Sequence, residues 1–292
     1  MRRSSSNHPQ IGLALSGGAA RGIAHVGVFR ALTENDIPIH CIAGTSAGSL
    51  VGGAIASGMP LAEIEAIARN LRWRDVGKMT VSRLGVQSNE RMEQYLKEHL
   101  PVSRFEHLRI PFAAVATNLQ NGEAVVMRDE GDVPFAIRAS CCIPGWYVPV
   151  IDEFGRQLVD GGLVANIPAS VARSLGADIV IAVDVNAEGA KFLGPSLSII
   201  GIVLQSMLLV QRTVSLHELQ HADAVIKPSV GHIRWDEMAR ADELLDAGYQ
   251  AALEAVPRIR EVIETAAKAS SRWYQLRRRK SLRVKNPQAS TT

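Results

Sequence analysis

Ser46 has the sequence surroundings of a nucleophile. It lies in Gly44-Thr45-Ser46-Ala47-Gly48, after an apolar run and before a stretch of small residues. A short strand that turns sharply into a helix through G-x-S-x-G forms a nucleophile elbow, which exposes the serine hydroxyl. Gly44 and Gly48 suit this turn because a side chain at either position would collide with the neighbouring strand or helix. The helix N-terminus favours negative charge beside Ser46. By itself the short motif leaves catalysis and an ordinary tight turn equally open.

A second group of small residues lies upstream, in Ser16-Gly17-Gly18-Ala19-Ala20-Arg21-Gly22, directly after the apolar run 11–15. Consecutive glycines leave backbone N–H groups unobstructed, which suits an oxyanion or a phosphate. No Lys-Ser/Thr follows as in a phosphate loop, and the G-x-G-x-x-G spacing of a dinucleotide site is absent. N–H donors beside a nucleophilic serine would stabilise the tetrahedral intermediate of acyl transfer. Arg21 adds a donor, anchors the loop, or is an ordinary residue of a helix start.

Asp160 ends a predicted strand and precedes a glycine turn, in Leu158-Val159-Asp160-Gly161-Gly162. Alone, it is typical of a turn aspartate that bonds its own backbone. Beside a nucleophile, its carboxylate accepts the serine proton directly or through water. Because a carboxylate is a weak base for a hydroxyl, this chemistry needs a desolvated site that raises its basicity. No histidine lies in a motif that makes it a partner for Ser46.

Strands and helices alternate around these motifs. Apolar and β-branched runs predict strands at 11–15, 39–43, 111–117, 123–127, 178–184 and 222–227, and amphipathic patterns predict helices at 20–34, 61–71 and 90–100. Strands separated by helices imply a largely parallel sheet flanked by helices. We find no internal repeat and no linker, and therefore expect one α/β domain over 11–270, between a disordered segment 1–10 and a basic tail 271–292.

Taken in order, the three motifs resemble those of the patatin-like phospholipases, and most closely the bacterial group related to the catalytic domain of neuropathy target esterase. The flanks agree, since Ala24-His25-Val26-Gly27-Val28 follows the first loop and Ala139-Ser140-Cys141-Cys142-Ile143-Pro144-Gly145 precedes the aspartate turn. The resemblance is strong over residues 11–185 and looser to residue 255. Family members often carry three or four glycines in the first loop, where this chain has two after Ser16.

The resemblance implies a patatin-like three-layer α/β/α sandwich with a mostly parallel central sheet. It also implies hydrolysis of lipid acyl esters, in phospholipids or lysophospholipids, without a metal or other cofactor. Ser46 would be the nucleophile and Asp160 the base. The N–H groups of Gly17, Gly18 and Ala19 would form the oxyanion hole.

Two other functions stay open. His217-Glu218-Leu219-Gln220-His221 matches the zinc-binding pattern H-E-x-x-H, with Glu237 or Glu243 as a third ligand. This is the weaker alternative, because the run ends close to a predicted strand and short motifs arise by chance. The other alternative is a regulatory or adaptor module that keeps the fold but has little turnover.

Charge is distributed unevenly. The 292-residue chain has a net charge of +3, but residues 271–292 contain seven basic and no acidic side chains, which leaves −4 on the rest. The tail, including Arg277, Arg278, Arg279 and Lys280, could lie on an anionic membrane surface or be merely solvated. We expect no nucleic-acid partner, and the pattern does not indicate an oligomeric state.

The cysteines, the first ten residues and one apolar stretch indicate the cellular compartment. Three cysteines form no disulfide framework, and the polar first ten residues lack the apolar core of a secretory signal. The apolar stretch 193–210 is interrupted by polar residues and barely long enough to span a bilayer, which favours a buried or surface-docked helix. We expect a cytoplasmic protein, peripheral on the inner face of the membrane.

Overall fold

One large sheet organises the chain. The computed structural model describes residues 9–80, 82–188 and 199–284. Within these ranges the sheet has eight strands, in the order β10-β9-β1-β2-β5-β8-β7, and β6 pairs with β5. Neighbours from β10 to β5 run parallel, whereas the pairs that involve β6, β7 and β8 are antiparallel. The strands are β1 (Ile11–Leu15), β2 (Cys41–Thr45), β5 (Phe112–Asn118), β6 (Ala124–Arg128), β7 (Val150–Ile151), β8 (Gln157–Asp160), β9 (Ile179–Val183) and β10 (Ala224–Ile226), and β3 (Lys78–Met79) pairs separately with β4 (Gln87–Ser88).

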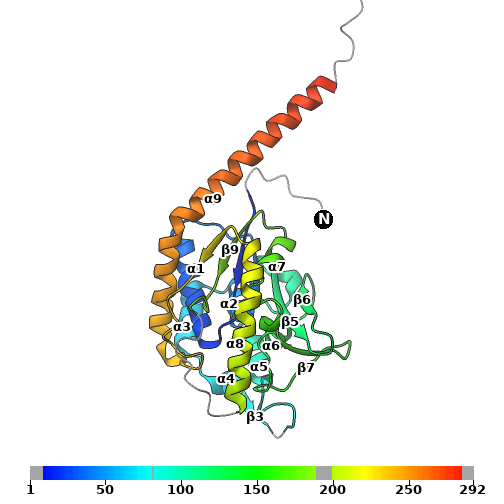
Figure 1. Ribbon diagram of the computed structural model, residues 1–292, viewed down its shortest axis with the longest axis vertical. Helices are drawn as coiled ribbons and strands as arrows, with labels where there is room; N and C mark the ends of the chain where they lie inside the picture. Colours follow the sequence, from blue (N-terminus) through cyan, green and yellow to red (C-terminus); the bar gives the residue numbers. More distant parts are fainter. Residues whose placement is uncertain (1–8, 81, 189–198, 285–292) are drawn as a thin grey trace, which may run out of the picture.

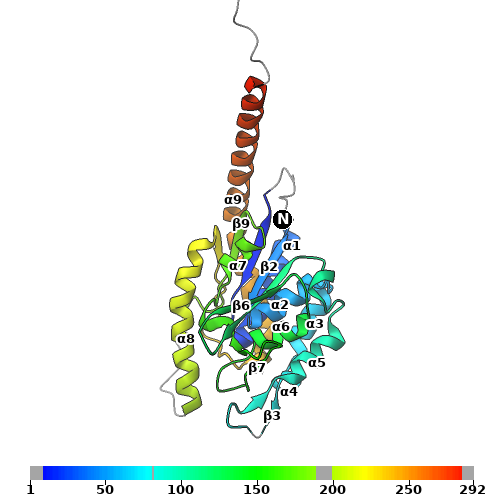
Figure 2. The same ribbon diagram turned by 90° about the vertical axis from the view of Figure 1, so that its right-hand side faces the viewer.

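Helices cover both faces of this sheet (Figures 1 and 2). The α-helices are α1 (Ala24–Glu34), α2 (Ala47–Ala56), α3 (Leu61–Asn70), α4 (Trp73–Val76), α5 (Glu90–His99), α6 (Val133–Ser140), α7 (Ala169–Ser174), α8 (Ile199–Glu218) and α9 (Ala241–Val284). Short 3-10 helices are η1 (Ala19–Ile23), η2 (Phe105–His107), η3 (Gly161–Leu163), η4 (Leu219–His221) and η5 (Met238–Arg240). Figure 2 shows α8 on one side of the molecule and α3 and α5 on the other.

The two faces differ in the size of their side chains. Successive residues of a strand point to opposite faces. In β1, Leu13 and Leu15 belong to the larger core, together with apolar residues of α1, α2, α3, α5, α6 and α9. Ala14 points the other way, into a smaller core that includes residues of α7. The small side chains on this second face let the segment after β8 pack close to the sheet.

These observations confirm the prediction of a mostly parallel sheet between helical layers. The six predicted strands form within two residues of their expected ends, and 61–71 and 90–100 become α3 and α5. The predicted helix 20–34 divides into η1 and α1. In the described ranges, we find no helix that is both long and apolar enough to cross a bilayer. The described part of the stretch 193–210 belongs to α8.

Helix α9 joins the body to the predicted tail. Its first half is held by buried apolar side chains, among them Leu244, Leu245, Ala252 and Ile259. Its helical backbone continues to Val284 and extends beyond the sheet (Figure 1). Part of the predicted tail 271–292 is thus helical, while residues 285–292 and the predicted disordered residues 1–8 lie outside the described ranges.

Candidate active site

Ser46 occupies a strained turn between β2 and α2. Its backbone has φ 52° and ψ −124°, and it is the residue directly before the helix. Serine rarely adopts positive φ, and such a conformation costs about 1–3 kcal/mol, which the surrounding structure must offset. The side chain is 7% exposed. The turn therefore has the geometry that the sequence motif predicts for an elbow.

The two glycines of the motif are explained by close backbone contacts. A Cβ atom on Gly44 would lie 2.4 Å from the carbonyl oxygen of Gly48, and one on Gly48 would lie 2.2 Å from that of Leu15. Both distances are far below van der Waals contact, so a side chain at either place would push β2 or β1 away from α2. This is the steric reason that the sequence indicated for Gly44 and Gly48.

Ser140, at the end of α6, holds the backbone of the turn at Ser46 in place. Its hydroxyl group accepts a hydrogen bond from the N–H of Ser46 (2.8 Å) and donates one to the carbonyl of Val115 in β5 (2.6 Å). Ser140 is fully buried, so water does not compete for these bonds. In the sequence, Ser140 stands out only as part of the flanking motif 139–145, and no local pattern predicts this role.

Asp160 reaches Ser46 through the register of the sheet. Thr45 pairs with Val115 of β5, and Asp160 pairs with the next residue, Ala116, on the same side, because β6 pairs with both positions from the other side. The carboxylate also accepts a hydrogen bond from the N–H of Gly162 (2.8 Å). Asp160 is thus both the turn aspartate of the simple interpretation and a neighbour of Ser46.

The electrostatics of Asp160 suit a base. Its side chain is 1% exposed, and burial raises the pKa of the carboxyl group to about 6. Hydrogen bonds from the Ser46 side chain and from the Gly162 N–H act in the opposite direction and lower the pKa. Desolvation is the larger effect because it removes the water that would stabilise the charged form. Burial thus gives the Asp160 carboxylate the higher basicity that it needs to accept a proton from a serine hydroxyl.

The glycine-rich loop offers two N–H donors to the same space. The N–H of Gly17 is already used, since it donates to the carbonyl of Asn166 (3.0 Å). For the N–H groups of Gly18 and Ala19 we find no hydrogen-bond partner within the described part of the chain. Ala19 has φ 49°, a second strained non-glycine residue beside Ser46. The expected set of three donors therefore reduces to Gly18 and Ala19.

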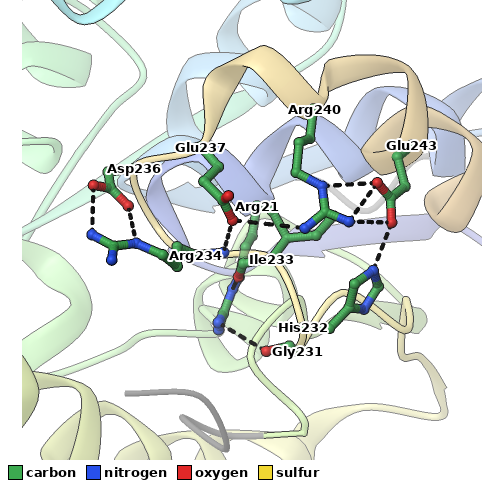
Figure 3. A network of polar contacts seen from close by, with 9 residues as sticks. All are labelled: Arg21, Gly231, His232, Ile233, Arg234, Asp236, Glu237, Arg240 and Glu243. Atoms are coloured by element: carbon green, nitrogen blue, oxygen red, sulfur yellow. Dashed lines mark hydrogen bonds and ion pairs between the residues drawn. The ribbon is translucent and has the colours of Figure 1, made fainter. Parts of the chain in front are cut away.

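Arg21 joins the glycine-rich loop to a segment far along the chain, residues 231–235. Its Nε donates to the carbonyl of Ile233 (2.7 Å) and another nitrogen to that of Gly231 (3.3 Å) (Figure 3). A third nitrogen donates to Asn186 Oδ1 (3.2 Å). Arg21 is 5% exposed. Burial lowers the pKa of its guanidinium group, and the negative charge of Glu188 opposes this. Of the roles considered from the sequence, the anchor matches these contacts.

These residues line one pocket. Its wall includes Ser46, Asp160, Gly18, Ala19 and Arg21, and it is completed by side chains from elsewhere in the chain, namely Ile143, Asn186, Met207, Leu208, Gln211 and Trp235. Trp235 is held by edge-on contacts with Trp73 and Trp146, at ring-centroid distances of 5.7 and 5.9 Å.

The residues of this outer wall were not predicted from the sequence. Asn186 has a recognisable signal, because polar residues just after a parallel strand lie at the edge where such sheets bind ligands. Residues Met207 to Gln211 carry no local signal of this kind.

The H-E-x-x-H motif has another explanation. Glu218 accepts hydrogen bonds from the N–H and hydroxyl of Ser170, at the start of α7. Glu237 and Glu243 bond instead to Arg234, Arg240 and His232 (Figure 3). Over the described ranges, we find no group of three or more His, Cys, Asp or Glu side chains placed to hold a metal. The geometry does not favour the zinc alternative.

Comparisons with known proteins agree on one family. A family model described as patatin-like phospholipase matches residues 13–173. An uncharacterized NTE family protein of Mycobacterium tuberculosis is 37% identical over 193 residues, which is 65% of this chain and 53% of that protein. The lysophospholipase NTE1 of Mycosarcoma maydis is 36% identical over 181 residues, or 60% of this chain and 10% of that protein. The chain thus spans about half the length of the first relative and much less of the second.

A solved structure shares the fold. The crystal structure of VipD from Legionella pneumophila superposes with a TM-score of 0.58 at 14% identity, covering 87% of this chain and 67% of that one. At this identity, the likeness concerns the arrangement of the sheet and helices alone.

Proposed function

The chain belongs to the patatin-like phospholipase family, and we propose that it is a serine esterase that hydrolyses acyl esters of phospholipids or lysophospholipids. Family membership supports lipid hydrolysis as the general activity. The lysophospholipase named among the relatives motivates the narrower substrate class. The observation that carries the proposal is the joint position of Ser46 and the buried Asp160 in one pocket with two N–H donors.

Acylation begins with Ser46. Its Oγ attacks the carbonyl carbon of the ester while Asp160 accepts the hydroxyl proton, which gives a tetrahedral intermediate. The N–H groups of Gly18 and Ala19 donate to the oxygen on which negative charge develops, and the N-terminus of α2 adds a favourable field. The intermediate collapses when the C–O bond to the alcohol breaks, and the alcohol leaves with the proton from Asp160. The acyl group remains on Ser46.

Deacylation reverses these roles with water in place of the alcohol. Asp160 takes a proton from the attacking water, and the second tetrahedral intermediate uses the same two donors. Collapse releases the fatty acid and returns the proton to Ser46. A single carboxylate can serve both steps because its raised pKa lets it accept and release a proton near neutral pH.

The other site residues position these groups. Gly44 and Gly48 permit the elbow, and Ser140 holds the N–H of Ser46. Arg21 ties the donor loop to residues 231–235, so that Trp235 stays at the pocket wall. We also propose that the protein acts in the cytoplasm at the inner face of the membrane, with Arg277, Arg278, Arg279 and Lys280 contacting anionic lipid.

Hydrolysis and covalent labelling of the purified protein test this function. A fluorophosphonate bonds through phosphorus to the attacking serine oxygen and loses fluoride, so it marks an activated serine. Full activity and full labelling in Ser46→Ala would refute the role of Ser46. Absence of turnover across a broad panel of acyl esters, with a ligand still bound, would favour the regulatory or adaptor alternative.

A further inference from the structure

A second cavity adjoins the catalytic pocket. Ala19, which carries one of the proposed oxyanion donors, lines both. The second cavity has a volume of about 90 Å³. Among the residues that the structure describes, its lining includes no Asp, Glu, Lys or Arg side chain. It is therefore an apolar space directly beside a site for ester chemistry.

One face of α2 leads from the nucleophile into this cavity. Ala47, Leu50, Val51 and Ala54 all line it. Their spacing of three, four and seven residues places them on the same side of the helix. Because Ala47 directly follows Ser46 in the chain, this face starts at the nucleophile and continues along the helix away from it.

Helices α3 and α5 form the opposite wall. Ile64 and Ala68 of α3 and Met92 and Leu96 of α5 line the cavity, and each is less than 9% exposed. The rings of Tyr95 and His99 stack with their centroids 4.0 Å apart and also line it. Since His99 is exposed and Tyr95 partly so, this ring pair closes the cavity near the protein surface.

The partition between the two cavities is made of small residues. A Cβ atom on Gly22 would lie 2.3 Å from the Cβ of Ala47, so Gly22 has no room for a side chain. Gly22, Ala47 and Ala19 line the apolar cavity at its side nearest Ser46. Because Ala19 lines both spaces, a chain that extends from one to the other displaces only small side chains.

An unfilled apolar space of this size needs a reason. Protein interiors are close-packed, and each cavity lowers stability because its lining loses contacts. Concave, mostly apolar pockets with few polar groups are the usual form of a small-molecule site. A polar head group would find no charged partner here, whereas a hydrocarbon chain would gain free energy roughly in proportion to the area it buries.

We propose that this cavity holds the acyl chain of the substrate, which enters past Ala19 and Ala47 and lies between α2, α3 and α5. The inference rests on the proposed function, because it assumes that the ester carbonyl binds at Ser46. It assigns the head group to the pocket formed by Arg21, Asn186 and Trp235. It also makes a long unbranched chain the preferred acyl group, with Tyr95 and His99 at its far end.

A photoreactive probe locates the chain directly. A long-chain alkyl fluorophosphonate with a terminal diazirine is reacted with the full chain, irradiated, digested and mapped by mass spectrometry. We expect the phosphorus on Ser46 and the photoadduct within residues 61–100. Photoadducts confined to α8 or Trp235 would overturn the inference while the proposed function stands. Failure to label Ser46 would count against the proposed function instead.

The free fatty acid with the same diazirine, bound to Ser46→Ala, tests the cavity without any reaction. Adducts on α3 or α5 that unlabelled hexadecanoate competes away support the cavity. If neither α3 nor α5 is labelled, the fatty acid does not bind in this cavity and the inference is wrong.

A filled cavity should change chain-length preference. Ala68→Phe and Ala54→Phe place a ring in the space, and Ala66→Phe is the matched control, since Ala66 lies exposed on the same helix as Ala68. We expect the ratio of kcat/KM for a hexadecanoyl ester to that for a butanoyl ester to fall by about tenfold or more in the two cavity variants. The control should keep the wild-type ratio. An unchanged ratio in both folded cavity variants would refute the assignment, and if neither variant folds, the two photolabelling experiments decide.

Discussion

Ser46 and Asp160 lie where the ends of β2 and β8 meet along the same side of β5. Thr45, the last residue of β2, pairs with Val115, and Asp160, the last residue of β8, pairs with Ala116. Val115 also pairs with Val126 of β6, and Ala116 with Val125, so β6 occupies the other side of β5 and no strand separates β2 from β8. Because β2 is parallel to β5 and β8 antiparallel, two strands of opposite direction both end at the middle of β5. This arrangement brings a nucleophile and a carboxylate together at the point where the two strand ends meet.

Removing either group should abolish most of the activity. We expect Ser46→Ala to eliminate fluorophosphonate labelling and ester hydrolysis. Asp160→Asn keeps the shape of the side chain but cannot accept the proton, so kcat should fall by about 10²–10⁴-fold. Steady-state kinetics with a soluble ester measure both effects. A folded Asp160→Asn variant with wild-type kcat would show that another group is the base.

The rate should depend on the ionisation of Asp160. Only the carboxylate accepts a proton, and its pKa is about 6. We therefore expect kcat/KM to rise with pH through about 6 and to level off near neutral pH. A profile measured with a non-ionising ester checks this. A rate that is constant down to pH 4 would contradict the assignment.

Burial of Asp160 should also cost stability at neutral pH. The pKa is about 6 in the folded protein and 3.8 in the reference state, so the folded state binds the proton more tightly. The stabilising contribution of this proton is complete below about pH 4 and is lost as the pH rises through about 6. The difference amounts to about 3 kcal/mol at neutral pH.

Asp160→Asn should therefore unfold at higher denaturant concentration than the wild type at pH 8, and the advantage should vanish at pH 4. Chemical denaturation at the two pH values measures it. If the variant is more stable than the wild type by the same amount at pH 8 and at pH 4, burial of the Asp160 charge is not the cause.

Much of this site follows from local patterns, and the rest from long-range contacts. The strand ends and the turn at Ser46 were predictable because apolar runs, glycines and small residues act within a few positions. The bond from Ser46 to Ser140 joins residues 94 positions apart, and that from Arg21 to Ile233 joins residues 212 apart. Nothing in a local pattern encodes such pairs.

In the glycine-rich loop, too, the sequence does not show which N–H groups are free to bind a ligand. Gly17 and Gly18 are equivalent in the sequence, and only the contact with Asn166 shows that the first N–H is occupied. Likewise, the H-E-x-x-H pattern says nothing of Ser170, which bonds the Glu218 carboxylate.

Ser140 should act as a positioning residue for the elbow. Ser140→Ala leaves the buried N–H of Ser46 without an acceptor, at a cost of about 1–3 kcal/mol. Because the strained turn then relaxes, we expect kcat for a soluble ester to fall by roughly tenfold or more, with KM little changed. Ser140→Cys, which retains a weak acceptor, should recover part of the loss.

Ser57→Ala is the matched control, since Ser57 is equally buried at the C-terminal cap of α2 and its hydroxyl donates to the carbonyl of Ala54 in the same helix. A similar fall in kcat for both variants would mean that Ser140 contributes only to general stability.

Arg21 should control the pocket wall through residues 231–235. Arg21→Met removes three hydrogen bonds and leaves the carbonyls of Gly231 and Ile233 unpaired. We expect the free energy of unfolding to fall by about 2 kcal/mol or more and the tryptophan fluorescence to change as Trp235 moves. KM for a phospholipid should rise. Arg21→Lys keeps the charge but not the three contacts, and should restore little.

The control on the same loop is Arg234→Met, because exposed Arg234 pairs with Asp236 and does not line the pocket (Figure 3). If Arg234→Met perturbs fluorescence and KM as strongly as Arg21→Met, the anchor is not specific to Arg21.

Deletion of residues 271–292 should separate membrane binding from catalysis. Among the residues whose burial the structure describes, the buried apolar side chains that dock α9 end with Ile259 and precede the deletion, so the body should fold and hydrolyse soluble esters at the wild-type rate. The seven basic side chains removed would each contribute roughly 1 kcal/mol near an anionic surface, an attraction that salt weakens. We therefore expect cosedimentation with vesicles of phosphatidylserine to fall sharply and binding to neutral phosphatidylcholine vesicles to change little. Replacement of Arg277, Arg278, Arg279 and Lys280 by glutamine should reproduce most of the loss without shortening the chain. Equal binding of the full and shortened chains to anionic vesicles at low salt would assign membrane contact to another surface.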